Sequence, residues 1–441
     1  MKIKSNTLQF RRAMQLTLLA TVTASVDLTL AGDELPITII HAGTLLSVPG
    51  KLPRMKQSLV ISEGRISQVT DGFISGSSIS DNARVIDLSD RFVMPGMMDM
   101  HVHLTMKGSM DAEKIETTDS DYAMVAVENA RKTLMAGVTT VRDLGASSGE
   151  AVVAVRDAIN RDAIPGPRIL AAGHALSATA GHADLVGVRE DHAVLYRSSG
   201  VCDGADDCRR AVRAQYKIGA DLIKIMATGG GADSNGKQDS APEMFDDELL
   251  SIVNTAHRIG LKVTAHAHGT AGINAALAAG VDSLEHSSYL DERSIELYLK
   301  TGAHLVATAS LFKYFQGSTL PEQVKRQLAK KATVVKKRFA KAHAAGVTFS
   351  MGTDAGISNH GENAEELVAY VDLGMSPMQA LITATVNTAT LTGLSEELGT
   401  LEVGKIADVI AFGTNPLDDI NAVRDVRFVM RSGITHRYDV F

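Results

Sequence analysis

The chain has 441 residues, which is long for one small domain and fits a barrel with an appended domain. Hydrophobic residues make up 45% of the sequence and charged residues 22%, as in an ordinary soluble globular protein. The net charge of −7, the absence of tryptophan and an aromatic content of only 4% argue against a nucleic-acid partner.

The N-terminal residues 1–31 have the pattern of a secretory signal peptide. A basic start precedes an apolar stretch over residues 13–24, and Ala24 and Ala31 are small residues suited to a cleavage site. The apolar stretch is too short for a good membrane span. We therefore expect the mature chain to be secreted or periplasmic and to have no membrane contact. The alternative is a disordered or amphipathic N-terminal arm.

Short runs of strand-forming residues, separated by glycines, occur near both ends of the chain. They lie at Ile37–Ile40, Ser58–Ile61, Ile66–Val69, Asp408–Phe412 and Val426–Met430. These runs predict a small β-sandwich domain that residues 35–93 and 400–441 build together. Residues 94–399 would then form a second domain, inserted between the two parts of the first.

The inserted segment alternates between strand-like and helix-like stretches. Strands are predicted at 138–141, 168–172, 221–226, 262–266, 281–286, 304–308 and 347–354, and helices at 150–161, 206–218, 246–259, 270–279, 291–301 and 321–345. This repetition predicts an α/β fold in which a parallel sheet closes as a (β/α)₈ TIM-like barrel. An open doubly wound sheet is the alternative, but no Gly-x-Gly-x-x-Gly motif of a dinucleotide site follows a first strand.

The two cysteines of the chain, Cys202 and Cys208, are close together in the sequence. In a periplasmic chain this arrangement predicts a short disulfide loop, with a pair of free thiols as the alternative. Neither cysteine has a histidine near it in the sequence, so we expect no catalytic role for them.

The motif His101-Val102-His103 follows an apolar run that begins after Pro95-Gly96 and is predicted to be a buried strand. An extended strand points residues i and i+2 to the same face, so both imidazoles can meet one metal ion. A His-x-His motif by itself is also common among surface and core histidines.

Further side chains of the types that bind metals follow later in the predicted strands, near the ends where barrel active sites are built. They are Lys224, His266, His268, His286 and Asp354. A buried lysine such as Lys224 needs a partner or a changed charge. Each of these residues alone is more often structural, but their recurrence at strand ends is hard to explain as packing and predicts a metal site.

With this order of residues, the chain resembles the amidohydrolase superfamily. In that family a His-x-His motif on the first strand is followed by a lysine on the fourth, a histidine on each of the fifth and sixth, and an aspartate on the eighth. The resemblance covers about residues 37–428 and includes the runs 93–104, 136–143 and 404–409. Within the superfamily, the chain is most similar to the binuclear branch of Xaa-Pro dipeptidases and carboxypeptidases, with ochratoxin-hydrolysing amidases as relatives.

The resemblance implies two divalent metal ions, expected to be Zn²⁺. One ion would be held by His101, His103 and Asp354, and the second by His266 and His286. Nitrogen and carboxylate ligands suit zinc, although Mn²⁺ or Co²⁺ are alternatives.

The resemblance also assigns roles around the two ions. Lys224 would be carboxylated by CO₂, and its carbamate would bridge the ions. A metal-bridging hydroxide would attack the amide carbonyl, and Asp354 would carry its proton to the leaving amine. His182 and His268 would contact the substrate, with a position behind the ligands or at the rim as the alternative for His268.

These roles predict hydrolysis of an amide bond in a dipeptide or an N-acyl amino acid, including amides of the ochratoxin A type. The alternatives are a cyclic amide or lactone hydrolase, a deaminase of the same superfamily, or a non-catalytic oligomeric scaffold. Deaminase members generally lack the bridging lysine, so Lys224 disfavours that alternative. The resemblance further implies a homo-oligomer, with an octamer as a common form.

Overall fold

The computed structural model of the chain describes residues 37–106, 117–145, 147–184, 198–230 and 241–439. The predicted signal peptide, residues 1–31, lies outside these described residues. Within them, no helix combines the length and the apolar character needed to cross a membrane.

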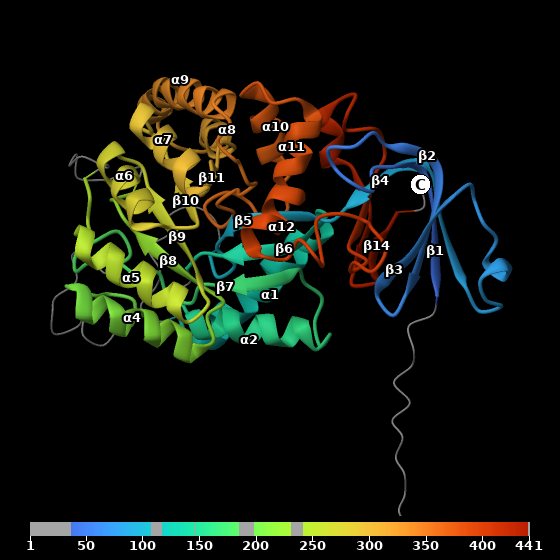
Figure 1. Ribbon diagram of the computed structural model, residues 1–441, viewed down its shortest axis with the longest axis horizontal. Helices are drawn as coiled ribbons and strands as arrows, with labels where there is room; N and C mark the ends of the chain where they lie inside the picture. The colour runs from blue at the N-terminus through green and yellow to red at the C-terminus, as the bar shows by residue number, and fades with distance from the viewer. Residues whose placement is uncertain (1–36, 107–116, 146, 185–197, 231–240, 440–441) are drawn as a thin grey trace, which may run out of the picture. The chain divides into compact units, whose positions relative to one another are not determined.

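Strands and helices alternate along most of the described chain (Figure 1). The strands are β1 (Thr38–Leu45), β2 (Arg54–Ser62), β3 (Arg65–Asp71), β4 (Arg84–Pro95), β5 (Met97–Val102), β6 (Val138–Asp143), β7 (Arg168–Ala171), β8 (Leu222–Met226), β9 (Lys262–Ala267), β10 (Ser283–His286), β11 (His304–Val306), β12 (Val409–Phe412), β13 (Val426–Arg431) and β14 (Ile434–Tyr438). The helices are α1 (Asp119–Met135), α2 (Gly149–Asn160), α4 (Ala205–Ile218), α5 (Asp246–Arg258), α6 (Thr270–Ala279), α7 (Glu292–Thr301), α8 (Leu311–Gly317), α9 (Glu322–Ala344), α10 (Glu365–Asp372), α11 (Pro377–Thr383) and α12 (Val386–Thr392), with the short 3₁₀ helices η1 (Gly76–Ser78) and η2 (Ile420–Arg424).

The helices predicted between residues 150 and 345 are confirmed to within one residue at each end. Several other elements were not predicted, namely α1, α8, α10, α11, α12 and β14. The buried face of α1 includes the small residues Ala126 and Ala130, which weaken the apolar periodicity that identifies a helix.

The strands from the two ends of the chain form one seven-stranded sheet in the order β14-β13-β12-β4-β1-β2-β3. β4 joins the two ends, because it pairs in parallel with β1 and antiparallel with β12. Residues 84–93 of β4 pair with β1 and residues 92–95 pair with β12, so the two ends of the chain build one large sheet together, and its folding into a β-sandwich stays a prediction. The sheet also extends past residue 93, to Pro95.

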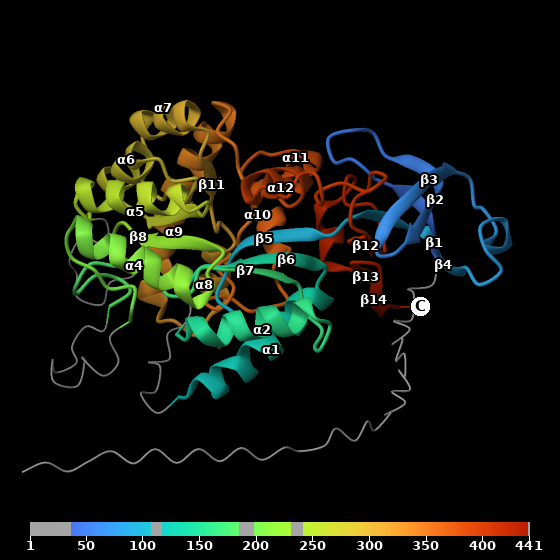
Figure 2. The ribbon, with the colours of Figure 1, turned by 60° about the horizontal axis from the view of Figure 1, so that its bottom comes forward.

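The middle of the chain contains two parallel sheets, in the orders β5-β6-β7 and β11-β10-β9-β8. Parallel strands need long crossover connections, which are usually helices. Here α1 and α2 lie side by side next to β6 and β7 (Figure 2), and α4, α5, α6 and α7 pack against one another in chain order. The predicted α/β fold is confirmed by this arrangement.

Isolated pairs of residues lie at the edges of the two parallel sheets. Leu176, which follows β7, pairs with Ile225 in β8. The segment 347–355 contacts β11 through Phe349 and Leu305, and contacts β5 through Ala355 and Val102. This segment therefore lies between an edge strand of one sheet and an edge strand of the other.

The regular strand predicted at residues 347–354 is wrong, because this segment makes isolated bridges instead. Asp354 has a φ of 60°, in the left-handed region that strands do not use. Gly352 passes so close to β5 that a Cβ atom on it would lie 3.0 Å from the Cβ atom of His101. Because Gly352 lies so close to β5 and the backbone turns at Asp354, this segment does not pair as a regular strand.

The predicted disulfide between Cys202 and Cys208 is confirmed, with the two Cα atoms 5.0 Å apart. Both cysteines are buried, and Cys208 lies in the first turns of α4. The backbone N–H of Cys202 donates to the carbonyl of Ser177 at 3.0 Å. The bridge therefore braces the segment after β7, which also carries His182.

Replacing Gly352 by alanine is expected to destabilise the fold beside β5. The added Cβ atom would lie 2.3 Å from Cγ1 of Val306, a fully buried residue of β11. Overpacking of this kind typically costs about 1–3 kcal/mol. The midpoint of denaturant unfolding, compared between Gly352→Ala and the unsubstituted protein, measures the loss.

Gly317→Ala is the matched control, because nothing lies within 4 Å of the Cβ atom that it adds. This control variant should unfold at the same denaturant concentration as the unsubstituted protein or at a higher one. An unchanged midpoint for Gly352→Ala would contradict the close approach of residues 347–354 to β11.

Candidate functional site

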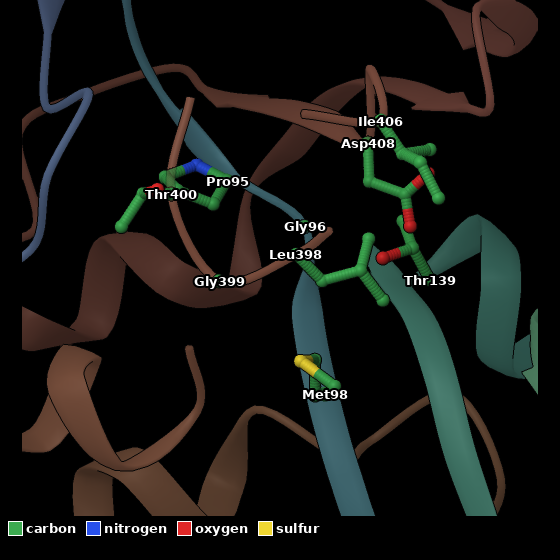
Figure 3. A pocket seen from close by; sticks show the side chains of 9 residues that line it. All are labelled: Pro95, Gly96, Met98, Thr139, Leu398, Gly399, Thr400, Ile406 and Asp408. Atoms are coloured by element: carbon green, nitrogen blue, oxygen red, sulfur yellow. The ribbon is translucent and has the colours of Figure 1, made fainter. Parts of the chain in front are cut away.

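The narrow pocket in Figure 3 does not have the properties of a substrate site. It lies at the beginning of β5 and leaves no space for a water molecule. Its lining residues are Pro95, Gly96, Met98, Thr139, Leu398, Gly399, Thr400, Ile406 and Asp408. The predicted ligands lie toward the opposite, C-terminal ends of the parallel strands, where α/β enzymes build their active sites.

The ends of the parallel strands bring the predicted ligands together. His101 and His266 are the last residues but one of β5 and β9, and His286 is the last residue of β10. Lys224 lies in the middle of β8. Asp354 is attached to the end of β5, because its backbone N–H donates to the carbonyl of His101 at 2.7 Å.

His101, His103 and Asp354, here called the first group, form a tight triangle of donor atoms. The Nε2 atoms of the two histidines are 3.3 Å apart, and Asp354 Oδ1 lies 3.4 Å from His101 Nε2 and 3.1 Å from His103 Nε2. A tetrahedral zinc ion with bonds of about 2.0–2.1 Å separates its ligand atoms by about 3.3–3.4 Å. The first group therefore has the dimensions of three ligands around one small cation.

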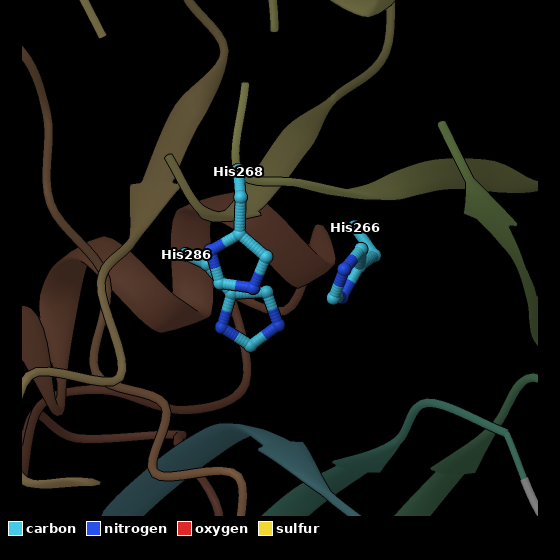
Figure 4. A group of neighbouring side chains, drawn as sticks. All are labelled: His266, His268 and His286. Carbon is cyan, nitrogen blue, oxygen red and sulfur yellow. The ribbon is translucent and has the colours of Figure 1, made fainter. Parts of the chain in front are cut away.

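His266, His268 and His286 form a second group (Figure 4). Their ring centroids are 4.6–4.8 Å apart, and one nitrogen of each ring lies within 4.8 Å of the others. One atom of His286 also lies within 4.8 Å of ligand atoms of His101 and Asp354, so His286 links the two groups. His268, predicted to contact the substrate, lies as close to this group as the predicted ligand His266.

Each histidine of the two groups uses one ring nitrogen to contact an oxygen atom outside the groups. The pairs are His101 Nδ1 with Glu285 Oε2 (2.8 Å), His103 Nδ1 with the Gly145 carbonyl (2.7 Å), His266 Nε2 with the Gly229 carbonyl (3.2 Å), His268 Nδ1 with Ser288 Oγ (2.8 Å) and His286 Nδ1 with Thr308 Oγ1 (2.8 Å). A carbonyl oxygen can only accept a hydrogen bond, so His103 carries its proton on Nδ1 and keeps the Nε2 lone pair for a metal ion. Contacts of this kind orient metal-binding histidines.

Burial keeps the imidazoles of the second group neutral, because it disfavours their charged forms. Burial lowers the pKa of His266 and His286 well below the usual value for histidine. Burial is also the main reason why the pKa of His268 falls to about 3. Burial would raise the pKa of Asp354, but the electrostatic effect of His101, His103 and Lys224 outweighs it and holds that pKa far below its usual value. Neutral imidazoles and an ionised carboxylate are the forms that bind metal ions.

Lys224 is 1% exposed and lies among the apolar residues of β8. Burial lowers the pKa of its amine to about 8, against the opposing effect of nearby carboxylates. The charge of Lys224 is in turn one cause of the lowered pKa values of His101, His266 and His286. The amine therefore lies within electrostatic range of both groups.

His182, predicted to contact the substrate, lies beside the second group. Its ring centroid is 4.7 Å from that of His266, and the residue is exposed. Its backbone N–H donates to Glu243 Oε2 at 2.8 Å. A Cβ atom on Gly230 would lie 2.3 Å from the His182 ring, so the ring packs closely against the segment that follows β8.

The backbone is strained at two of the predicted ligands. His286 and Asp354 have φ values of 65° and 60°, in the left-handed region that residues other than glycine rarely adopt. Thr308, whose hydroxyl contacts His286, has a φ of 48°. Conformations of this kind cost about 1–3 kcal/mol each and gather at active sites, where the surrounding structure holds them in place.

Sequence reasoning assigned no role to the buried charged residues that surround the ligands. Asp99, Arg142 and Glu285 are at most 3% exposed. Asp99 Oδ1 accepts from the backbone N–H of His101 at 3.0 Å, and Glu285 lies between Arg142 and His101. The available signal was an ionisable residue within a predicted buried strand, or directly after one in the case of Arg142, because a buried charge needs a partner.

The donor atoms of the cluster fit a site for divalent metal ions. They combine imidazole nitrogens with the Asp354 carboxylate, whose Oδ1 is buried and has no hydrogen-bond partner among the described residues. Buried oxygen atoms are normally hydrogen-bonded, so this one is suited to contact a cation. Nitrogen and oxygen ligands of these types are those that zinc and similar ions take.

Comparisons with known proteins agree with this site. A model described as the amidohydrolase family matches residues 92–435. An ochratoxinase from Aspergillus niger is 34% identical over 427 residues, covering 90% of this chain and 85% of that protein. The crystal structure of a Xaa-Pro dipeptidase with bound methionine in its active site has a TM-score of 0.82 and 36% identity, covering 91% of this chain and 100% of that one. The crystal structure of A. niger ochratoxinase has a TM-score of 0.80 and 31% identity, covering 92% and 96% of the two chains.

The family match spans most of the chain and includes all the predicted ligands, and two of these relatives are more than 30% identical across nearly its full length. The chain therefore belongs to the amidohydrolase family, and the protein is a hydrolase that acts on C–N bonds.

Proposed function

We propose that this protein hydrolyses the amide bond of a dipeptide or an N-acyl amino acid at the histidine cluster. The observation that carries the proposal is the convergence of donor atoms from His101, His103, His286 and Asp354 within a few ångströms of one another. The names of two relatives, an ochratoxinase and a Xaa-Pro dipeptidase, support an amide or dipeptide substrate.

We propose that two divalent ions, most simply Zn²⁺, bind at the cluster. His101, His103 and Asp354 would hold one ion, and His266 and His286 the other. The dimensions of the first group and the neutral imidazoles of the second support this assignment. When bound, such ions lower the pKa of water and polarise a carbonyl group.

The amine of Lys224 is proposed to be carboxylated. The uncharged amine would add to the carbon of CO₂ and lose one proton, which leaves an anionic carbamate whose oxygen atoms would be available as ligands for both ions. The lowered pKa of Lys224 supports this step, because burial favours the uncharged amine that reacts. The additional negative charge would also help to balance two buried divalent cations.

Asp354 is the proposed proton carrier. Its carboxylate, kept ionised by neighbouring charges, can take a proton from the attacking water and pass it to the amine that leaves. The backbone of Asp354 is held in position for this transfer, since its N–H donates to the carbonyl of His101 at 2.7 Å. The burial of Asp354 limits competition from bulk water for the same proton.

His182 and His268 are the proposed substrate contacts. The exposed ring of His182 beside His266 supports contact with a substrate carbonyl. The position of His268 supports a ligand role equally well, because it lies in the same group as His266 and His286. Metal analysis of His268→Ala separates the two roles, since only the loss of a ligand lowers the metal content.

We further infer that the two parallel sheets belong to one (β/α)₈ barrel. The pairing of Leu176 with Ile225, and the contacts of residues 347–355 with β11 and β5, support closure at both pairs of edges. The secreted or periplasmic location and the homo-oligomeric state remain predictions that cell fractionation and light scattering would test.

Removing the metal ions with a chelator is expected to abolish hydrolysis, and Asp354→Asn to lower its rate by about 10²–10⁴-fold. Asp246→Asn, at an exposed position in the first turn of α5, is the control and should retain full activity. Amine release is measured together with the metal content of each variant. Hydrolysis that persists unchanged after both treatments would contradict the mechanism.

Lys224→Ala is expected to bind fewer than two metal ions per chain, because the variant lacks the bridging carbamate. Lys262→Ala removes an exposed lysine that pairs with Asp282 and should keep both ions. Elemental analysis gives the metal content, and NMR with isotopically labelled bicarbonate detects the carbamate. A Lys224→Ala variant that is active and retains two ions would rule out the bridge.

A panel of dipeptides, N-acyl amino acids and ochratoxin-type amides should contain a subset that the zinc-loaded enzyme hydrolyses. Release of amine from that subset, absent with Asp354→Asn, would establish the reaction and its side-chain preference. Turnover of lactones or cyclic amides, with none across the amide panel, would favour the alternative hydrolase function instead.

A further inference from the structure

Glu285 is a fully buried carboxylate on β10 that lies directly behind His101. Its Oε2 atom is 2.8 Å from His101 Nδ1, and neither atom has a hydrogen-bond partner elsewhere in the described chain. The other ring nitrogen of His101, Nε2, lies 3.4 Å from Asp354 Oδ1. A carboxylate therefore contacts each ring nitrogen of His101. Glu285 contacts Nδ1, and Asp354, a member of the first group, contacts Nε2.

Arg142 on β6 fixes the carboxylate of Glu285 in place. Its Nη2 atom donates to Glu285 Oε1 at 2.9 Å, and its Nε atom donates to the carbonyl of Met100, next to His101, at 2.8 Å. The hydroxyl of Thr264 on β9 also donates to Oε1. Partners on β6 and β9 therefore hold one oxygen of Glu285, and the other oxygen faces β5 and His101.

The partner of His101 differs in charge from those of the other histidines in the two groups. Their outer contacts are the neutral carbonyl or hydroxyl oxygens described above. A carboxylate that accepts the Nδ1 proton fixes the tautomer in which Nε2 carries the lone pair, and it makes the ring more basic toward a metal ion. Arg142 balances the buried charge of this carboxylate, which lowers the cost of keeping it ionised.

We propose that Glu285 is a positioning residue of the metal centre, which accepts the Nδ1 proton of His101 and turns the Nε2 atom of that ring toward the ion. This inference rests on the proposed function, because it assumes that the first group binds a metal ion. Arg142 is the buried counter-charge that holds Glu285 in position. Neither residue would touch the substrate.

The test is the affinity of the protein for Zn²⁺, measured by competition with a chelating dye. Glu285→Gln keeps the size of the side chain but removes its charge, and it should weaken zinc binding by about 10- to 100-fold. Glu366→Gln is the matched control, since Glu366 is equally buried but accepts from the backbone N–H groups of Ala309 and Ser310. The control should bind zinc as tightly as the unsubstituted protein.

The outcomes separate this inference from the proposed function. Equal zinc affinity in Glu285→Gln and the unsubstituted protein would overturn the positioning role and leave the proposed function intact. Failure of the unsubstituted protein to bind any zinc would instead overturn the proposed function. Equal weakening by Glu285→Gln and Glu366→Gln would also overturn the positioning role, because it would mean a general effect of lost stability.

A double variant keeps the inference testable if Glu285→Gln does not fold. Arg142→Met combined with Glu285→Met removes both charges, and replacing a buried ion pair by apolar residues of similar volume is often neutral for stability. This variant should fold and show the same loss of zinc affinity. Zinc binding at full affinity in the folded double variant would overturn the inference.

Discussion

The buried carboxylate of Asp99 connects β5 to the segment that carries Asp354, and the geometry of the first group depends on this connection. Asp99 Oδ1 accepts from the backbone N–H groups of His101 and Thr353 at 3.0 and 3.1 Å. Its Oδ2 atom accepts from the Thr353 hydroxyl at 2.6 Å and from Asn363 Nδ2 at 2.8 Å. A buried carboxylate needs such donors, so the backbones around two ligands of one proposed ion are held together.

The need of buried charges for partners also explains the charged residues that surround the histidines. The charged side chains between the strands are buried away from solvent, so each takes a partner from another strand. Arg142 and Glu285 satisfy each other across β6 and β10, and His101 lies against that pair. The ligands are therefore oriented by contacts made behind them, before any ion or substrate is bound.

The sequence alone predicted the α/β fold, the helix limits between residues 150 and 345, the disulfide and the residues of the cluster. These features depend on local information: the period of apolar residues, the residue types at strand ends and the spacing of His101 and His103. Because parallel strands place their C-terminal ends at one edge, residues far apart in the sequence could be expected to meet there. His266 and His286 illustrate this, with ring centroids 4.6 Å apart on adjacent strands.

Only the tertiary structure decided which contacts each of these residues makes. His286 links the two groups, and His266 and His268 are both placed to be ligands in the second group. Both facts depend on ring positions that the spacing of residues in the sequence does not predict. The pairing of β4 on both edges, and the irregular segment that ends at Asp354, result from long-range packing. The sequence determined which chemical groups reach the site, because local periodicity assigns them to strand ends, whereas packing between distant segments determined their distances, orientations and charges.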